Sequence, residues 1–440
     1  MGNKDRERQD IDRREMRRKR RHRNQVIAYV TLFILIALAA AGVVFGVKTY
    51  TEQQDQDDSQ TPQSQVGALL ESEEPLEIVK ESTEEVIPEQ TPEEKLNEIV
   101  DAAISVMPLE DKVAGLFVVR PESITGVATA VRASDGTRDA LAKYAVGGIV
   151  YFAKNIQSAD QLKEMISNTQ SYSKYPLFIG VDEEGGSVSR LADKGLADKV
   201  DSAQTIGQTL DAANAFQAGT AIGTYLTEFG FNLDFAPVAD LTNISNSVMT
   251  KRAYGSDAAS ATPFVISMLQ GLEEQGITAC VKHFPGIGST VQDTHDGLAV
   301  SNRTAEEFRA EEFTVFKAAI DAGANMIMVG HMAAPSLVGD NTPSSMSSVI
   351  VTDILREELG FEGVIITDAM DMSAISEYYG ADYAAIMALK AGCDMILMPD
   401  DFELAYTGVL QAVYDGVISE ERVNDSLRRI YRIKYAGQVK

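Results

Sequence analysis

Short apolar runs alternate with amphipathic segments from about Pro92 to Lys440. Continuous apolar runs of this length are typical of parallel strands that are buried on both faces. Segments with helical spacing lie between them, for example 304–323 and 347–360, and the first opens with Thr304 and Glu307 at the spacing of a capping box. The eight apolar runs are 115–119, 147–152, 177–182, 232–240, 279–284, 326–331, 363–368 and 395–400.

Eight strand–helix units predict the α/β class and, more specifically, a (β/α)8 TIM-type barrel over residues 92–440. A doubly wound open sheet is the alternative, because counting runs cannot show that a sheet closes. Most of the runs end in a polar or ionisable residue, and in a barrel the carboxyl ends of the strands converge on the active site. These residues are Asp182, Asp240, Lys282 with His283, His331, Asp368 and Asp400.

The N-terminal region has a different pattern. Residues 26–48 contain an uncharged stretch, Val26–Val47, which is long enough to cross a bilayer as a helix. The basic residues 1–25 before it predict a cytoplasmic tail, so the catalytic domain is expected outside a single-pass cell membrane anchor. A cleavable signal peptide is the alternative. Residues 49–91 are rich in acidic and polar residues without a sustained period, which predicts a disordered linker.

The charge distribution restricts the partners. Residues 1–23 hold 11 Lys/Arg and 5 Asp/Glu, whereas the rest of the chain holds 28 and 60. So acidic a body is not expected to bind nucleic acid, because a phosphate backbone requires clustered Lys/Arg. The two cysteines, Cys280 and Cys393, lie in apolar surroundings and are predicted to be buried free thiols rather than a disulfide.

Two of the four histidines lie in one stretch, "KHFPGIGSTVQDTH", which runs from Lys282 to His295. Asp293 stands two residues before His295, and a carboxylate that bonds one ring nitrogen fixes the tautomer of the other. The pair is therefore a candidate general acid/base, although two solvated loop residues would have the same spacing. Neither zinc-ligand spacing nor a Gly-x-Ser-x-Gly elbow occurs, so no metal, no cofactor and no serine nucleophile is expected.

These residues resemble glycoside hydrolase family 3, and in particular its NagZ-type β-N-acetylglucosaminidases. The pattern Lys-His-Phe-Pro-Gly-x-Gly, four residues, then Asp-(Ser/Thr)-His is matched by "KHFPGIG", "STVQ" and "DTH". The resemblance extends over about 340 residues, in family order. The further matching stretches are "VDEEGGSVSR", "FAPVADL", "KRAYGSD", "MVGHM", "ELGFEGVIITDAM" and "ERVNDSLRRIYRIKY".

The resemblance implies a retaining exo-β-N-acetylglucosaminidase without a cofactor. Asp368 would be the nucleophile, and His295, oriented by Asp293, would be the acid/base. The positions that match the family's sugar-binding residues are Asp182, Arg190, Arg252, Lys282 and His283. The expected partners are β-GlcNAc-terminated glycans or muropeptides of the cell wall. A phosphorylase, or a catalytically weak membrane-tethered module that binds cell-wall glycans, would be compatible with the same residues.

The chain departs from the family pattern in places that bear on specificity. The family usually has Ser-Phe where this chain has Ala253-Tyr254, Arg where it has Ser187, and Asp where it has Ala369. The second α/β domain of some relatives is not expected here, because the chain ends just after the last predicted helices. These departures bear on the contacts to the leaving group and on fine specificity.

Overall fold

The computed structural model describes residues 90–242, 244, 247–290 and 297–438, which belong to one compact unit, Ile87–Lys440. The predicted tail 1–25, the predicted membrane helix 26–48 and the predicted linker up to residue 89 lie outside the described residues. Within the part of the chain that is described, no helix combines the length and the hydropathy needed to cross a membrane.

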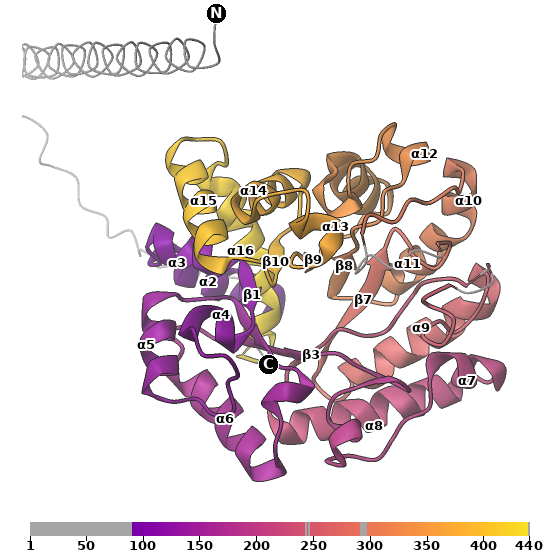
Figure 1. Cartoon of the computed structure of the whole chain (residues 1–440), viewed down its shortest axis with the longest axis horizontal. Helices are drawn as coiled ribbons and strands as arrows, with labels where there is room; N and C mark the ends of the chain where they lie inside the picture. The colour runs from indigo at the N-terminus through magenta and orange to yellow at the C-terminus, as the bar shows by residue number, and fades with distance from the viewer. Residues whose placement is uncertain (1–89, 243, 245–246, 291–296, 439–440) are drawn as a thin grey trace, which may run out of the picture. The chain divides into compact units, whose positions relative to one another are not determined.

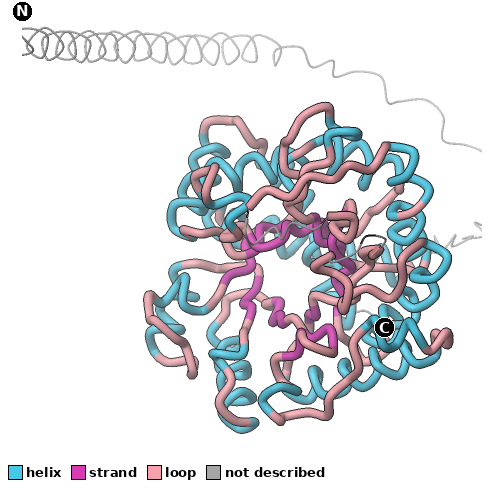
Figure 2. Tube along the Cα trace, turned by 45° about the vertical axis from the view of Figure 1, so that its right-hand side comes forward, coloured by secondary structure: helices cyan, strands magenta, loops and turns pink. Residues whose placement is uncertain are grey.

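Eight parallel strands form a closed barrel, which Figure 2 shows as a ring surrounded by helices. The first strand pairs with both the second and the last, through Val118↔Gly148 and Phe117↔Ile396, so the sheet has no free edge. The barrel prediction is confirmed, and the open-sheet alternative is wrong. In barrel order the strands are β1 (Phe117–Val119), β10 (Met395–Leu397), β9 (Val364–Ala369), β8 (Met326–Val329), β7 (Thr278–Phe284), β6 (Leu233–Asp234), β3 (Phe178–Val181) and β2 (Gly148–Val150).

Helices surround this ring in chain order (Figure 1). The first begins at Pro92, where Thr91 and Glu94 form a capping box. The α-helices are α2 (Pro92–Ser105), α3 (Leu109–Ala114), α4 (Pro121–Thr125), α5 (Asp135–Lys143), α6 (Ala159–Tyr172), α7 (Ala203–Gln208), α8 (Ala213–Phe229), α9 (Ala258–Glu273), α10 (Ala305–Ala310), α11 (Glu312–Asp321), α12 (Pro335–Val338), α13 (Ser373–Ser376), α14 (Ala381–Ala391), α15 (Phe402–Tyr414) and α16 (Glu420–Tyr435).

The remaining elements are short or irregular. A two-stranded antiparallel hairpin follows β3, and a π-helix replaces the regular helix predicted over 347–360. They are β4 (Glu183–Gly185), β5 (Val188–Ser189), the π-helix η4 (Val349–Glu358) and the 3₁₀ turns η1 (Ala153–Asn155), η2 (Ala192–Lys194), η3 (Ser344–Met346) and η5 (Ala436–Gln438).

The single helix predicted over 304–323 is wrong, because the segment breaks at Glu311 into α10 and α11. Glu311 has φ −116° and ψ −85°, outside the helical region. Its carboxylate accepts a 2.8 Å hydrogen bond from the backbone N–H of Ala258 at the start of α9. A tertiary contact to a neighbouring helix therefore overrides the local helical pattern.

The core fills the barrel interior and the layer between strands and helices. Cys280 on β7 and Cys393 before β10 are both buried and unpaired, as the sequence predicted. Lys282, His283 and Asp368 lie within β7 and β9. The other polar residues at the run ends stand on loops beyond their strands, namely Asp182, Asp240, His331 and Asp400. Asp400 is the exception in burial, because it is exposed to solvent.

Candidate active site

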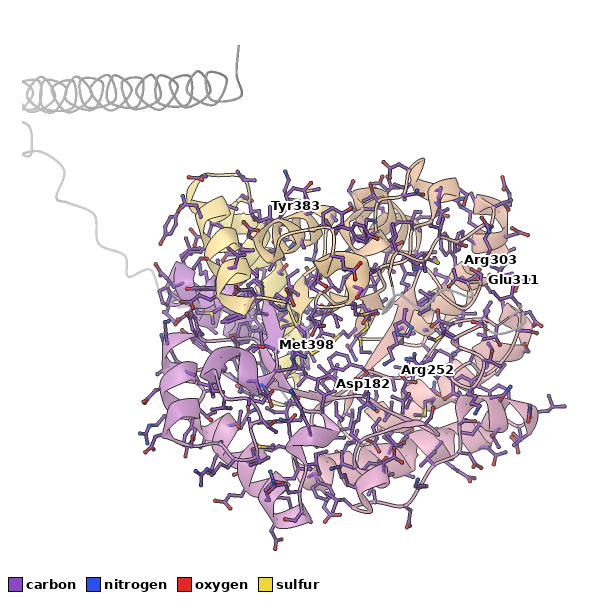
Figure 3. The ribbon with its side chains drawn as sticks, in the orientation of Figure 1. Asp182, Arg252, Arg303, Glu311, Tyr383 and Met398 are labelled. Carbon is purple, nitrogen blue, oxygen red and sulfur yellow. The ribbon has the colours of Figure 1, made fainter. Side chains whose placement is uncertain are left out.

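A cavity of about 290 Å³ lies at the carboxyl end of the barrel. Three residues of its wall, Asp182, Arg252 and Met398, are labelled near the centre of the view in Figure 3. Six of the eight predicted site residues line it: Asp182, Arg190, Arg252, Lys282, His283 and Asp368. The other two, Asp293 and His295, lie outside the described residues. The structure thus brings together residues of β7 and β9 with residues of the loops that follow β3, β5 and β6.

Lys282 lies at the centre of an ion-pair network in the cavity wall. Its side chain, 2% exposed, points inward from β7, and its Nζ is 2.8 Å from Asp182 Oδ1 and 2.7 Å from Glu184 Oε1. Arg252 makes a two-point contact with the same glutamate, with Nε 2.8 Å from Oε2 and Nη2 2.6 Å from Oε1. Arg190 Nη2 stands 3.7 Å from Asp182 Oδ2. Two acids and three bases therefore hold one another in fixed positions before any ligand arrives.

The hairpin β4–β5 places Glu184 in this network. Gly185 and Gly186 make its turn with φ of +87° and +57°, a region that side chains disfavour. A Cβ on Gly186 would also come within 2.6 Å of the Ser202 side chain. Glu183 points away from Glu184 and accepts hydrogen bonds from the backbone N–H groups of residues 190, 191 and 192. Glu183 thereby fixes the backbone from which the Arg190 side chain extends.

Asp368 lies on β9 and faces the cavity. Its Oδ1 accepts a 2.8 Å hydrogen bond from the backbone N–H of Ala369. His331 supports this turn, because its Nε2 donates to the carbonyl of Ala369 at 2.9 Å while its Nδ1 is 2.8 Å from Ser345 Oγ. The N–H and the carbonyl of residue 369 make these two contacts. An alanine at this position, where the family usually has Asp, can therefore make both of them.

The electrostatics keep the Asp368 carboxylate ionised. Burial by itself raises the pKa of Asp368, but the electrostatic interactions with His283, His331 and Lys282, together with the Ala369 N–H, outweigh burial and lower it below its ordinary value. An ionised carboxylate in an enclosed cavity is the form that a nucleophile requires.

Glu184 is also ionised, for a different purpose. Burial would raise the pKa of Glu184, but Lys282 and Arg252 overcome this effect and lower the pKa to about 2. Asp182 and Glu184 in turn raise the pKa of Lys282 despite its burial. Glu184 is therefore unsuited to donate a proton near neutral pH, and its role in the cavity is to hold two cations.

His283 forms a second pair of the aspartate–histidine type. Its Nδ1 is 2.7 Å from Asp240 Oδ2, and the other oxygen of Asp240 accepts from the backbone N–H of Ile287 at 2.6 Å. Asp240 is fully buried, so the imidazole orientation is fixed from behind the cavity. The peptide bond between Lys282 and His283 is cis. Spacing along the chain gave no sign of this pair, because its members are 43 positions apart.

The remaining wall of the cavity is apolar. Met398, directly after β10, adopts φ +44°, an uncommon conformation for a residue with a side chain. A cavity with an apolar wall and a few convergent polar groups suits a ring with an apolar face and a hydroxylated edge. The apolar lining residues include Phe152, Phe235, Met249, Met328, Met372, Leu397 and Met398.

The six predicted run-end groups thus separate into three kinds. Asp182, Lys282–His283 and Asp368 line the cavity, whereas Asp240 and His331 are buried behind it. Asp400 is exposed and does not line the cavity. Within residues 90–290 and 297–438, as far as they are described, no group of three or more His, Cys, Asp or Glu could hold a metal ion.

Comparison with known proteins identifies the family. The sequence profile described as "Glycosyl hydrolase family 3 N terminal domain" matches residues 108–433. The chain belongs to glycosyl hydrolase family 3. The resemblance seen in the sequence is therefore confirmed at the level of the family. All the residues that line the cavity lie within the matched segment.

Relatives within family 3 carry related names. β-Hexosaminidase A of Pseudoalteromonas piscicida is 31% identical over 325 residues, which are 67% of this chain and 54% of that protein. A β-hexosaminidase of Nitrosomonas eutropha is 34% identical over 262 residues, 58% of this chain and 74% of that protein. The solved family 3 β-N-acetylglucosaminidase from Paenibacillus sp. FPU-7 is 32% identical with a TM-score of 0.70, covering 76% of this chain and 63% of that one. This chain therefore spans little more than half of some relatives.

Proposed function

We propose that the chain is a retaining exo-β-N-acetylglucosaminidase that hydrolyses terminal β-linked GlcNAc. The observation that carries the proposal is the ionised Asp368 in a cavity that also holds the Asp182–Lys282–Glu184–Arg252 network. The names of the relatives, β-hexosaminidase and β-N-acetylglucosaminidase, support the choice of sugar.

In the first step, an Asp368 oxygen attacks the anomeric carbon, the bond to the leaving oxygen breaks, and His295 gives that oxygen a proton. In the second step, His295 takes a proton from water, the water oxygen attacks the anomeric carbon, and the ester bond to Asp368 breaks. Two inversions retain the configuration. Asp293 would hold the imidazole in the productive tautomer. A neutral imidazole adds no negative charge beside Asp368, so it would not raise the pKa of that carboxyl.

The polar wall would recognise the sugar. Asp182 can accept hydrogen bonds from two hydroxyls, while Arg190, Arg252 and Lys282 can donate charge-assisted bonds to hydroxyls or to the N-acetyl carbonyl. Because these side chains are already held by one another, binding loses little side-chain entropy. His283, fixed by Asp240, would contribute a ring nitrogen to the same sugar.

The setting is the outer face of a cell membrane, with cell-wall glycans or muropeptides as substrates. The uncharged stretch within 26–48 and the basic tail 1–25 support an anchor with the catalytic domain outside. The acidic segment 49–91 would then act as a tether.

The test uses the full-length chain with p-nitrophenyl β-N-acetylglucosaminide, the β-glucoside and the β-xyloside, each with and without inorganic phosphate. Release from the N-acetyl substrate alone, as free GlcNAc, supports the proposal. Faster cleavage of the glucoside contradicts the sugar assignment, and GlcNAc 1-phosphate would identify a phosphorylase. Glycan binding without turnover would identify a binding module.

The matched control is Asp368→Asn, which keeps the shape of the side chain and removes its charge. Loss of turnover together with an unchanged melting temperature supports the nucleophile assignment. Full activity in this variant would contradict it.

A further inference from the structure

Three tyrosines fall within six residues, Tyr378, Tyr379 and Tyr383, in a chain that contains no tryptophan. Tyr378 is 62% exposed and Tyr383 is 51% exposed, whereas Tyr379 packs against the core. The rings of Tyr379 and Tyr383 stack with centroids 5.9 Å apart and planes at 14°. The stack holds Tyr383 on a partly buried base, so the exposed aromatic surface is preorganised. We call these three residues the tyrosine rim.

The tyrosine rim stands at the catalytic end of the barrel. Helices that follow barrel strands begin at the carboxyl ends of those strands, so α13 and the start of α14 share that end with the cavity. In Figure 1, α14 lies above β10, and Figure 3 labels Tyr383, the third residue of α14. The rim therefore belongs to the loop region that follows the strand carrying Asp368.

A direct chain connection links the rim to the cavity. Met372 lines the cavity and caps α13. The backbone N–H groups of Tyr378 and Tyr379 both bond to the carbonyl of Ile375, so the helical turn continues to the tyrosines. Tyr378 thus stands six positions after a residue of the cavity wall, with only the short helix α13 between them. A glycan whose end occupies the cavity could therefore reach the rim with its next residues.

The chemistry of the rim favours a neutral glycan. A tyrosine ring offers an apolar face with a polar hydroxyl at its edge, and a pyranose offers C–H groups on its faces with hydroxyls around them. Glu377, which is exposed, and Asp382, which is partly exposed, stand within the same segment and would repel phosphates or an anionic lipid surface. Two exposed tyrosines, one of them stacked on Tyr379, therefore stand next to these carboxylates.

We propose that the tyrosine rim binds the leaving-group side of a β-linked glycan, one to three residues beyond the sugar in the cavity. This inference rests on the proposed function, because it assigns that enzyme a preference for oligosaccharides. The rim would contribute to substrate binding and would not touch the reacting atoms.

The kinetic test compares the full-length chain with Tyr378→Ala and Tyr383→Ala on N-acetylchitotetraose and on p-nitrophenyl β-N-acetylglucosaminide. The ratio of kcat/KM for the tetraose to that for the aryl substrate should fall roughly five- to tenfold, through KM, which is the size of one lost aromatic contact. The variant Tyr378→Trp, which keeps an aromatic ring at this position, should have the wild-type ratio. An unchanged ratio would overturn the proposal, as would an equal loss on both substrates.

The matched control is Tyr414→Ala. Tyr414 is 60% exposed but ends α15 at the opposite end of the barrel, where its hydroxyl donates to Glu110 at 2.7 Å. This variant should leave the ratio unchanged, and a fall equal to that of Tyr378→Ala would contradict a specific rim.

A binding measurement separates failure of the rim from failure of the proposed function. Two inactive chains are compared, the single variant Asp368→Asn and the double variant that also carries Tyr378→Ala. The Kd of each for N-acetylchitotetraose is measured by calorimetry. Weaker binding in the tyrosine variant supports the rim even if the wild-type chain shows no turnover. Equal Kd values overturn the rim and leave the hydrolase proposal standing.

Discussion

The two ends of the barrel both hold buried ion pairs, but their carboxylates are used differently. At the amino end, the buried Asp394 receives Arg356 Nη2 at 2.8 Å, Arg429 Nη1 at 3.1 Å and Arg422 Nη1 at 3.5 Å. Ser426 Oγ and the Ile365 N–H also donate to it. Both Asp394 oxygens are thus filled by the protein itself, with three guanidinium groups around one carboxylate.

At the carboxyl end, the acids keep capacity for a ligand. Asp368 Oδ1 accepts from the Ala369 N–H, while the described residues form no hydrogen bond to its Oδ2. Asp182 shares Lys282 with Glu184 and lines the cavity. The comparison teaches that burial and charge alone do not mark a functional cluster. A functional cluster is marked instead by an ionised carboxylate that lines a cavity and keeps an oxygen to which the described residues form no hydrogen bond, as in Asp368.

Removing the central cation should give the largest effect. Lys282→Met leaves Asp182 and Glu184 without their shared partner beside the ionised Asp368. We expect kcat/KM for the N-acetyl substrate to fall roughly 10²- to 10³-fold, because the uncompensated buried charges are worth about 3–4 kcal/mol.

The control for this prediction is Lys112→Met, another buried lysine, whose Nζ lies 2.8 Å from the half-exposed Glu420 on the surface side of the barrel. It should change the melting temperature without changing kcat/KM. Equal activity losses in the two lysine variants would mean that Lys282 acts only through stability.

The amino-end cluster should show the opposite pattern. Asp394→Asn leaves Arg356, Arg422 and Arg429 without a counter-charge, and we expect the free energy of unfolding to fall by about 3 kcal/mol. The activity of the folded fraction should stay at the wild-type level. Urea unfolding and kcat/KM on the same preparation measure the two effects.

Asp425→Asn is the control, because Asp425 pairs with Arg428 on a solvent-exposed face of α16. Exposed pairs contribute less than about 1 kcal/mol. A loss of kcat/KM in the folded Asp394 variant would contradict the division of labour between the two ends.

A smaller, pH-dependent effect should come from Glu312, which is buried against Gly286 in the loop that follows β7. Arg303 Nε lies 2.8 Å from Glu312 Oε1, yet within the described residues neither Glu312 oxygen has a hydrogen-bond partner. Burial raises the pKa of Glu312 from 4.5 to about 8, and the attraction of Arg303 offsets this only in part.

The sign of the effect follows from proton binding. Between pH 4.5 and about 8 the unfolded chain has lost the Glu312 proton while the folded chain keeps it, so the free energy of unfolding should fall as pH rises. Glu312→Gln should remove that slope. Urea unfolding at pH 5 and pH 8 measures it, and parallel slopes in the two chains would contradict the assignment.

Much of the fold and of the site could be predicted from the sequence. Buried parallel strands must be apolar throughout, and strand ends must carry the chemistry, so Lys282 and Asp368 were found from their positions in the pattern. The partners of these residues could not be found in this way. Asp240 reaches His283 across two neighbouring strands, and the break at Glu311 depends on a contact with α9. Such contacts exist only after the barrel has closed.

Asp400 shows the limit of the same reasoning. It ends an apolar run as Asp368 does, but the strand β10 stops at Leu397, three residues earlier, and Asp400 is exposed. The sequence pattern marks the end of a strand to within a few residues, and that uncertainty decides whether a side chain faces the cavity or the solvent.

The most direct test of the account is to trap the glycosyl-enzyme. A 5-fluoro β-N-acetylglucosaminyl fluoride forms the covalent ester quickly and releases it slowly, so the labelled chain can be digested and its peptides weighed. The account predicts one added 5-fluoro-N-acetylhexosaminyl group, on the peptide that contains Asp368. A label on another carboxylate, or continued turnover of the aryl substrate with no label on any peptide, would contradict it.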